Sequence, residues 1–316
     1  MIGAGSIGAR HTRNLVAAGA EVHVCDLDAA RAERVAAAID GAHASRLDLD
    51  EAASYDGVVV ASPTSEHAAQ LRALLEAGAR HVLVEKPVAT EADELEDLVE
   101  RSGTRVAVAY NLRFHEPIER LVALVRSGRI GRVIGLRLWA GSYLPDWRPG
   151  VDYRRTYSAR AELGGGVLLD AVHEIDLLLW LLDGRLRVAG AVVSRAGDLE
   201  IDVEDTVRAV LEHEDGAAVS IELDYVSRRY RRGIEAIGTR ATARLDWARH
   251  VLEIEDATGV EVEPADTPLD KSYERQDAQF VAWVAGGGPL PVDAATGAAA
   301  VAIARAIRHA AEGGRR

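Results

Sequence analysis

A lysine beside a glutamate at the end of an apolar run is the first feature of this sequence that could do chemistry. The run Val82-Leu83-Val84 is followed directly by Glu85, Lys86 and Pro87. Continuous apolar runs of this kind are typical of buried parallel strands, and open α/β sheets bind ligands at the carboxyl ends of their strands. A lysine placed there can stabilise a developing negative charge or handle a proton. An ordinary Glu-Lys pair at a strand end is the alternative interpretation.

The chain's own use of cations favours a special role for this lysine. Lysine and arginine together number 37, and Lys86 and Lys271 are the only lysines. A desolvated lysine can lose its proton, whereas arginine effectively cannot. A chain that uses arginine for almost every cation therefore makes Lys86 a candidate catalytic residue.

A second candidate site lies at the beginning of the chain, where Gly3, Gly5 and Gly8 form a G-x-G-x-x-G pattern that includes Ser6 and Ile7. A helical pattern follows, and then a strand pattern that ends in Asp26, 18 residues after the last glycine. This is the dinucleotide-binding fingerprint, in which main-chain N–H groups at the helix N-terminus approach a pyrophosphate and the acid binds the adenosine ribose. Because the carboxylate would repel a 2′-phosphate, and no arginine follows it directly, we expect NAD rather than NADP. A glycine turn without a ligand is the alternative.

The strand expected before this fingerprint is too short. About five residues would form it, but only Met1 and Ile2 precede Gly3. We expect either that the native chain begins upstream or that the fold tolerates a stub, and we favour an upstream beginning.

Alternating strand and helix patterns position these residues in the first part of the chain. An apolar strand over residues 56–61 leads through Ser62, Pro63 and Thr64 into a helix, with His67 in its first turn. The last strand, residues 105–109, precedes Asn111 and Arg113. This alternation predicts a parallel, doubly wound sheet. We expect the cofactor to contact the glycine-rich turn and the carboxyl ends of the strands. The expected contacts are Gly3, Gly5, Ser6, Ile7, Gly8, Asp26, Ser62, Pro63, Thr64, His67, Glu85 and Lys86.

The pattern changes after residue 112. Long alternating runs predict strands near residues 132–141, 186–195, 203–213, 217–225, 234–237, 243–247 and 251–255, and two helices, residues 270–285 and 293–311, close the chain. We therefore predict an α/β Rossmann domain, residues 1–112, with a truncated first strand. An α+β domain with an open, mainly antiparallel sheet, residues 113–316, follows it.

One loop of the second domain collects aromatic and basic residues. Four of the chain's 15 aromatic residues and four arginines lie between residues 143 and 160, and Trp147, Arg148 and Tyr157 are among them. Aromatic rings suit the C–H faces of a sugar, and arginine suits a carboxylate or phosphate. We expect a substrate-binding loop that favours acidic or phosphorylated sugars. A contact between subunits is the alternative.

A triple glycine, residues 164–166, precedes a helical pattern in which Asp170, His173 and Asp176 recur every three residues. Residues three apart share a helix face, so a carboxylate can fix the tautomer of the imidazole and raise its pKa. The pattern predicts a general acid/base. The alternatives are a helix histidine with ordinary hydrogen-bond partners and a pair of metal ligands. We expect no metal, because no further His or Cys cluster accompanies these residues.

Residues 1–8, Glu85-Lys86-Pro87 and the triple-glycine segment with Asp170, His173 and Asp176 together resemble the Gfo/Idh/MocA oxidoreductases over essentially the whole chain. The resemblance implies a Rossmann domain, an open sheet that joins subunits into a homodimer or homotetramer, and NAD(P)-dependent oxidation or reduction of a sugar or cyclitol. It also implies that Lys86 is catalytic, that His173 is the acid/base and that Asp170 is its partner. The family's usual spacing is Asp-x-x-x-His, whereas this chain has Asp170-x-x-His173, so Asp176 is a possible substitute. Taken together, the candidate substrate contacts are Asn111 and Arg113 past the last parallel strand, Trp147, Arg148 and Tyr157 of the aromatic loop, and Asp176.

The bulk composition limits the other possibilities. A net charge of −13 argues against nucleic acid and anionic membranes as partners. No run of about 20 uncharged apolar residues is present, and the single cysteine suits a reducing cytoplasm. Two rival functions stay open: a non-catalytic NAD(P)-binding regulator, and a glycosidase that uses NAD transiently.

Overall fold

A computed structural model describes residues 1–103 and 105–313. Its internal contacts define two compact units. The first comprises Met1–Phe114 with Leu269–Val301, and the second comprises His115–Pro268 with the chain from Ala302 onward. The predicted domain boundary, between residues 112 and 113, stays a prediction. The contacts add that residues 269–301 pack with the first unit.

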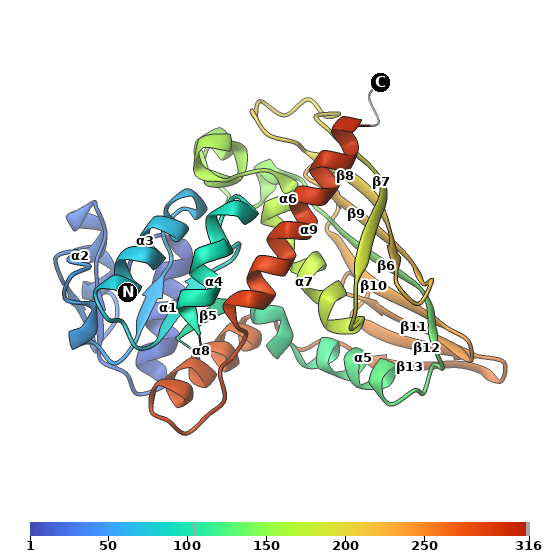
Figure 1. The fold of residues 1–316 in the computed structure, drawn as a ribbon, viewed down its shortest axis with the longest axis horizontal. Helices are drawn as coiled ribbons and strands as arrows, with labels where there is room; N and C mark the ends of the chain where they lie inside the picture. The colour runs from blue at the N-terminus through green and yellow to red at the C-terminus, as the bar shows by residue number, and fades with distance from the viewer. Residues whose placement is uncertain (104, 314–316) are drawn as a thin grey trace. The chain divides into compact units, whose positions relative to one another are not determined.

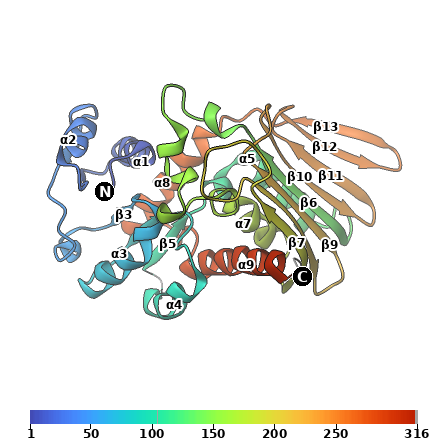
Figure 2. The same cartoon turned by 90° about the horizontal axis from the view of Figure 1, so that it is seen from above.

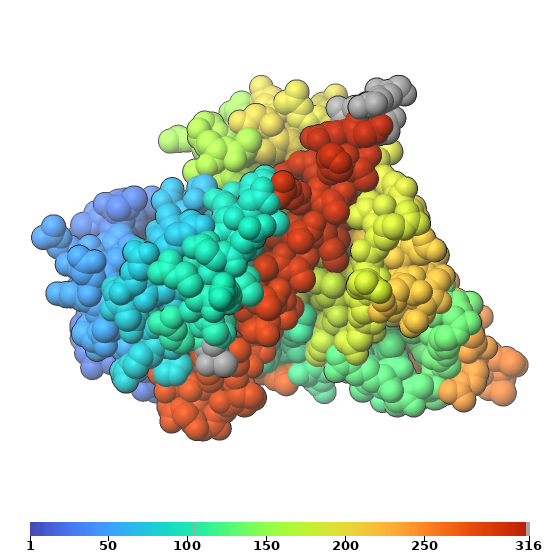
Figure 3. Space-filling view, in the orientation of Figure 1, coloured from blue at the N-terminus to red at the C-terminus, as the bar shows by residue number. Residues whose placement is uncertain are grey.

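The first unit alternates short strands and helices, as its apolar pattern predicts. Strand β4 contains the run that precedes Lys86, and all four of its residues are buried. The helices α3 and α4 lie on the surface of this unit (Figure 3). The elements are α1 (Ser6–Ala17), β1 (Val22–Val24), α2 (Ala29–Ala37), β2 (Ala42–Ala44), η1 (Ala52–Ser54), β3 (Val58–Val60), α3 (Thr64–Glu76), β4 (Val82–Glu85), η2 (Ala92–Leu95), α4 (Glu96–Ser102), β5 (Val106–Ala109), η3 (Asn111–Phe114), α8 (Asp270–Val284) and the first part of α9 (Ala294–Gly313).

The strands of this unit form two parallel groups, β1-β2 and β3-β4-β5. Ile2 links them, because it bridges Cys25 beyond β1 and Val60 in β3, both in parallel. The strand expected before the glycine turn is thus reduced to a single bridging residue. Beside it lies a cavity of about 790 Å³, lined by residues of β1, β3 and α8.

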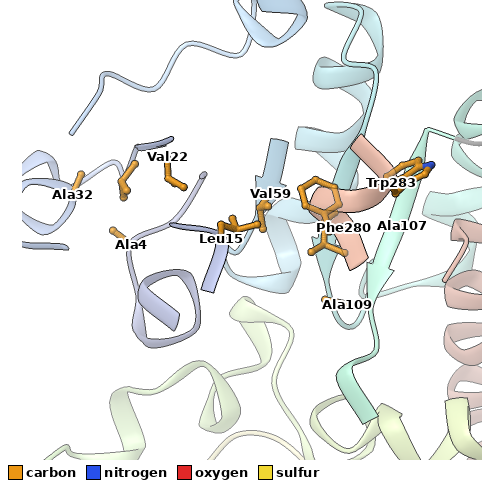
Figure 4. Packing of buried hydrophobic residues seen from close by; sticks show 11 residues of the cluster. Ala4, Leu15, Val22, Ala32, Val59, Ala107, Ala109, Phe280 and Trp283 are labelled. Carbon is orange, nitrogen blue, oxygen red and sulfur yellow. The ribbon is translucent and has the colours of Figure 1, made fainter. Parts of the chain in front are cut away.

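Helix α8 covers this sheet although it comes more than 150 residues later in the chain. Its Phe280 and Trp283 belong to one buried cluster with Leu15 of α1, Val59 of β3 and Ala107 of β5 (Figure 4). Burial of such large apolar side chains is the main force that holds a surface helix to a sheet. The carboxyl-terminal part of the chain therefore helps to position α1 and the strand ends.

The second unit is built on one eight-stranded sheet, β13-β12-β11-β10-β6-β9-β8-β7, seen on the right in Figures 1 and 2. Each of the seven predicted strands is present, but β13 was not predicted. The pairing is antiparallel except between β6 and β9, which are parallel, so the prediction of an open, mainly antiparallel sheet is confirmed. The strands are β6 (Val133–Gly141), β7 (Leu186–Ser194), β8 (Thr206–His213), β9 (Ala218–Asp224), β10 (Arg231–Gly238), β11 (Ala241–Asp246), β12 (Val251–Asp256) and β13 (Gly259–Pro264).

Alternating burial along β8 shows that the sheet has one covered and one open face. The helices α5 (Glu116–Arg126) and α7 (Val172–Leu181) pack on the covered face (Figure 1). The loop after β6 contains four short 3₁₀ helices, η4 (Leu144–Asp146), η5 (Tyr153–Arg155), η6 (Tyr157–Ala159) and η7 (Ala161–Leu163). Within residues 1–103 and 105–313, every helix is too short or too polar to be a membrane span.

The helix predicted after the triple glycine is interrupted. The short helix α6 (Val167–Asp170) ends at Ala171, whose ψ of 30° leaves the helical region, and α7 begins at Val172. Asp170 and His173 therefore lie on two consecutive helices separated by one residue, whereas His173 and Asp176 both lie in α7, and the predicted shared face of Asp170 and His173 stays a prediction.

Candidate active site

The glycine-rich turn has the geometry that a pyrophosphate requires. Gly3 has a φ of +94°, and a side chain on Gly3 or Gly8 would collide with the main chain at Ala61 or Gly3. In contrast, a Cβ on Gly5 would meet nothing within 4 Å. Gly5 is also the N-cap of α1 and has no side chain to bond the exposed N–H groups. Two glycines therefore allow close packing, while the third leaves the helix N-terminus open to an anion.

Asp26 lies at the end of β1, as predicted, and is bonded to the glycine turn. Its Oδ2 accepts from Ala4 N at 2.8 Å, and its Oδ1 accepts from Asp28 N at 2.9 Å. Arg31 lies 3.5 Å from the Asp26 carboxylate and 3.9 Å from Asp28. The acid thus has a cation nearby that the sequence argument did not foresee, because Arg31 reaches it from the first turn of α2.

The strand-to-helix turn after β3 carries Ser62, Pro63 and Thr64. Ser62 Oγ donates to Gln70 Oε1 at 2.7 Å. Pro63 is the N-cap of α3, no side chain caps this helix, and Thr64 is its first residue. His67 is buried at 1% exposure, with Nδ1 2.7 Å from Pro87 O and Nε2 3.0 Å from Ser62 O. Its predicted contact with the cofactor stays a prediction.

Glu85 connects Lys86 to a buried network that sequence reasoning missed. Its Oε2 accepts from Lys86 N at 3.0 Å, and its Oε1 lies 2.8 Å from His11 Nε2. The other ring nitrogen of His11 lies 2.7 Å from Asp277 Oδ1, and Asn14 Nδ2 donates to Asp277 Oδ2 at 2.8 Å. His11 thus joins helix α1, the end of β4 and helix α8. The available sequence signal was a histidine on the buried face of the helix that follows the glycine motif.

The charges of this network are set by burial and by its partners. Burial alone would lower the pKa of His11, but the charges and hydrogen bonds of Asp277 and Glu85 outweigh it and raise the pKa to about 10. Burial acts against the ionised form of Glu85 too, yet His11 and Lys86 hold its pKa below the usual range. His67 differs, because burial dominates and lowers its pKa. Near neutral pH, His11 is an imidazolium between two carboxylates and His67 is neutral.

In the second unit, Asp170 is surrounded by hydroxyl groups. Its carboxylate accepts from Tyr157 OH, from Ser158 Oγ at 2.7 Å and from Tyr225 OH at 3.0 Å. Burial, followed by the charge of Asp170, raises the pKa of both tyrosines well above 10, so both stay protonated and donate. Neither Ser158 nor Tyr225 was predicted. The predicted role of Asp170 as the partner of His173 stays a prediction.

His173 and Asp176 both lie in the first half of α7, exposed by 7% and 0%. Glu174, one of the two residues between them, is buried and accepts from Arg232 Nε of β10 at 2.7 Å. This helix therefore carries a histidine and two acids into the interior of the second unit.

The aromatic and basic loop is partly committed to internal contacts. Trp147 Nε1 donates to Ser142 Oγ at 2.5 Å, and the indole lies edge-on to Tyr225. Arg154 pairs with Asp152 and Glu200, so its charge is used within the protein. Arg148 is exposed. In the first unit, Asn111 Nδ2 donates to Ser272 Oγ at 2.7 Å, and Arg113 lies beside it in η3.

Comparison with known proteins identifies the two parts of the chain. Residues 1–110 match the model of an oxidoreductase family with an NAD-binding Rossmann fold, and residues 118–244 match the GFO/IDH/MocA C-terminal domain. Inositol 2-dehydrogenase 3 of Saccharopolyspora erythraea is 32% identical over 99% of this chain and 93% of its own. The chain belongs to the Gfo/Idh/MocA oxidoreductase family.

Two further proteins extend the comparison. The 1,5-anhydro-D-fructose reductase of Ensifer adhaerens is 28% identical over 82% of this chain and 78% of its own. The crystal structure of GenD2 from gentamicin A biosynthesis, in complex with NAD, superposes with a TM-score of 0.83 at 26% identity and covers 99% of this chain and 93% of that one. The predicted fold class and the predicted family are confirmed.

Proposed function

We propose that this oxidoreductase transfers hydride between NAD and a hydroxyl-bearing carbon of a sugar, sugar derivative or cyclitol. One observation carries the proposal: Lys86 follows β4 directly, with its main chain bonded to a buried carboxylate, in the same unit as the open N-terminus of α1. The names of the relatives, an inositol dehydrogenase and an anhydrofructose reductase, support this substrate class.

The residues of the first unit fit a dinucleotide. The main chain from Gly3 to Gly8 would hold the pyrophosphate, and Asp26 would accept hydrogen bonds from the adenosine ribose. Residues 62–64, with His67, Glu85 and Lys86, would lie along the rest of the cofactor. NAD is preferred over NADP because the Asp26 carboxylate would face a 2′-phosphate. When bound, the nicotinamide supplies the hydride acceptor or donor.

The protein's own contribution is proton handling and charge stabilisation. His173 removes the proton from the reacting hydroxyl as hydride leaves its carbon, and returns that proton in the reverse direction. Lys86 binds the reacting oxygen and stabilises its alkoxide-like charge. Asp170, whose carboxylate accepts from three hydroxyl groups, acts with His173 as its acidic partner, and Asp176 is the substitute for that role.

Residues around these groups would bind the substrate. Asn111 and Arg113 supply an amide and a guanidinium, whereas Trp147 and Tyr157 supply aromatic surface. Arg148 is exposed, which supports a preference for acidic, phosphorylated or nucleotide-linked sugars.

A homodimer or homotetramer through the sheet of the second unit completes the proposal. By the register of the strands, Val192, Val210 and Ile237 lie on one face, and they are exposed by 62%, 52% and 38%. Exposed apolar residues on an open sheet face are typical of subunit contacts. The mass in solution, measured by light scattering, tests this assembly.

The test of the function is the formation of NADH with a panel of neutral and acidic sugars and cyclitols. We expect net NADH with at least one of them. Release of free sugar from a glycoside without net NADH would select the glycosidase. Binding of NADH with no turnover of any substrate would select the regulator.

A further inference from the structure

The three residues around Lys86 are held from both sides by buried histidines. His11 of α1 contacts the side chain of Glu85, which precedes Lys86, and His67 of α3 contacts the carbonyl oxygen of Pro87, which follows it. The exposed fractions of His11 and His67 are 0% and 1%. Two different helices thus fix the two neighbours of one candidate catalytic residue.

The contact on the Glu85 side is a chain of charges. One oxygen of Glu85 accepts from His11 and the other from the main-chain N–H of Lys86, so both oxygens have a donor. Asp277 binds the opposite nitrogen of His11 at 2.7 Å and is itself held by Asn14. Glu85, His11 and Asp277 each have two hydrogen-bond partners in this network, which fixes the orientation of the Glu85 carboxylate. The carboxylate in turn fixes the Lys86 N–H that donates to it.

The contact on the Pro87 side is neutral. The two nitrogens of His67 lie 2.7 Å from Pro87 O and 3.0 Å from Ser62 O. A neutral imidazole has one N–H and donates to one carbonyl at a time. His67 therefore fixes the spacing between the turn at Ser62 and the segment that carries Lys86, without adding a charge.

We propose that His11 and His67 are positioning residues that set the direction in which Lys86 leaves the end of β4. The inference rests on the proposed catalytic role of Lys86. It assigns the charged histidine to the orientation of the Lys86 main chain and the neutral histidine to the position of the following residue. Asp277 extends this arrangement to α8.

Four variants of the whole chain, residues 1–316, test the proposal. His11→Gln removes the charge of the imidazolium. Asp277→Asn weakens the interaction with His11 but keeps one side-chain oxygen that can accept a hydrogen bond. His67→Leu removes the contact of the imidazole with the carbonyl oxygens of Pro87 and Ser62, and His67→Gln restores an N–H donor. Leu15→Ala is the matched control, because Leu15 is buried on the same helix as His11 but does not belong to this network. Each variant is compared with the others by melting temperature, kcat and the Kd of NADH.

A direct probe of Lys86 is possible because Lys271 is the only other lysine. Lys271 has an exposed side chain in α8 and pairs with Glu274. Acetylation of the two lysines by acetic anhydride, quantified by peptide mass spectrometry, gives a ratio in which Lys271 is the internal reference. This ratio reports the environment of Lys86 without any substrate.

We expect His11→Gln to lower kcat on the order of 10- to 100-fold, the scale of loss for a misplaced reacting group, and to change the acetylation ratio at least about threefold. The Kd of NADH should stay within about threefold. Asp277→Asn should give the same changes in smaller measure, and it decides the test if His11→Gln does not fold. His67→Leu should lower kcat about 10-fold, and His67→Gln should recover most of that loss. Leu15→Ala should change neither kcat nor the ratio.

Two results would overturn the inference. One is an unchanged kcat and acetylation ratio in His11→Gln, which would leave the network with a purely structural role. The other is an equal loss of kcat in His11→Gln and Leu15→Ala at equal melting temperatures. Lys86→Ala separates this inference from the proposed function. Full turnover in Lys86→Ala removes the catalytic role of Lys86, whereas a collapse there with an unaffected His11→Gln removes only the positioning role.

Discussion

Glu85 in the first unit and Asp170 in the second are both carboxylates exposed by only 7%, and each lies close in sequence to a candidate catalytic residue. Glu85 is neutralised by an imidazolium that a second carboxylate also holds. Asp170 accepts instead from three neutral hydroxyls. Both arrangements satisfy a buried charge, the first with a charged donor and the second with neutral hydroxyl donors. The two regions should therefore respond differently to mutation and to pH.

The largest expected effect on stability is the loss of the charged partner. Removing one member of a buried ion pair leaves an uncompensated charge, which costs about 3–5 kcal/mol. His11→Gln should lower the free energy of unfolding by this amount, because Glu85 and Asp277 both lose their positively charged partner. Urea denaturation gives the value, with Leu15→Ala measured beside it. A loss below that of a single hydrogen bond would contradict the charged network.

Removing one hydroxyl from Asp170 should cost less. A hydrogen bond to a charged group contributes about 1.5–3 kcal/mol, and the hydroxyls of Tyr157 and Ser158 still donate to Asp170 after Tyr225→Phe. We expect a loss of stability in this range from the same denaturation experiment. A loss as large as that of His11→Gln would mean that Asp170 depends on one donor and that the contrast between the two regions is wrong.

The pH dependence should separate the two regions most clearly. The pKa of His11 rises from an unfolded value of 6.5 to about 10 on folding, so its contribution is fully present below about pH 6.5 and is lost as the pH rises through about 10. The stability difference between the wild type and His11→Gln should shrink over this window. The difference for Tyr225→Phe should stay constant there up to about pH 9, because the pKa of Tyr225 lies well above 10. Parallel curves for both variants would contradict the assignment of charge.

The smallest effect concerns cofactor choice. Asp26→Ser removes the carboxylate that would face a 2′-phosphate. Arg31, which lies 3.5 Å from that carboxylate in the wild type, then keeps only its ion pair with Asp28 of these two acids. We expect the ratio of kcat/KM for NADP to that for NAD to rise about 10-fold or more, since a cation then lies near the ribose. The double variant with Arg31→Ala is the control and should lose that gain. An unchanged ratio in Asp26→Ser would remove the argument for NAD.

The local parts of this account could be predicted from the sequence. The apolar run before Glu85, the glycine turn and the alternation in residues 203–213 each reflect the geometry of one element, so their periodicity identified β4, the beginning of α1 and β8. Lys86 stood out because lysine is so rare in this chain. These signals depend only on neighbours in the sequence.

Contacts between distant segments could not be predicted in the same way. His11 and Asp277 are 266 residues apart, and no periodicity links a histidine on one helix to an acid on another. The parallel pairing of β6 with β9 likewise depends on the order of strands in the sheet. The break at Ala171 escaped because the 3.6-residue pattern continues across it. It coincides with the bonds from Tyr157 and Tyr225 that hold Asp170.

Turnover by Lys86→Ala and Lys86→Arg, measured as NADH formation alongside the Kd of NADH, tests the central claim most directly. Arginine keeps the charge but has a different shape and cannot lose a proton. The account predicts that both variants bind NADH within about threefold of the wild type. It also predicts a loss of kcat of at least about 100-fold in Lys86→Ala, a scale typical of a lost charge-stabilising group. Ordinary turnover by Lys86→Ala would contradict it.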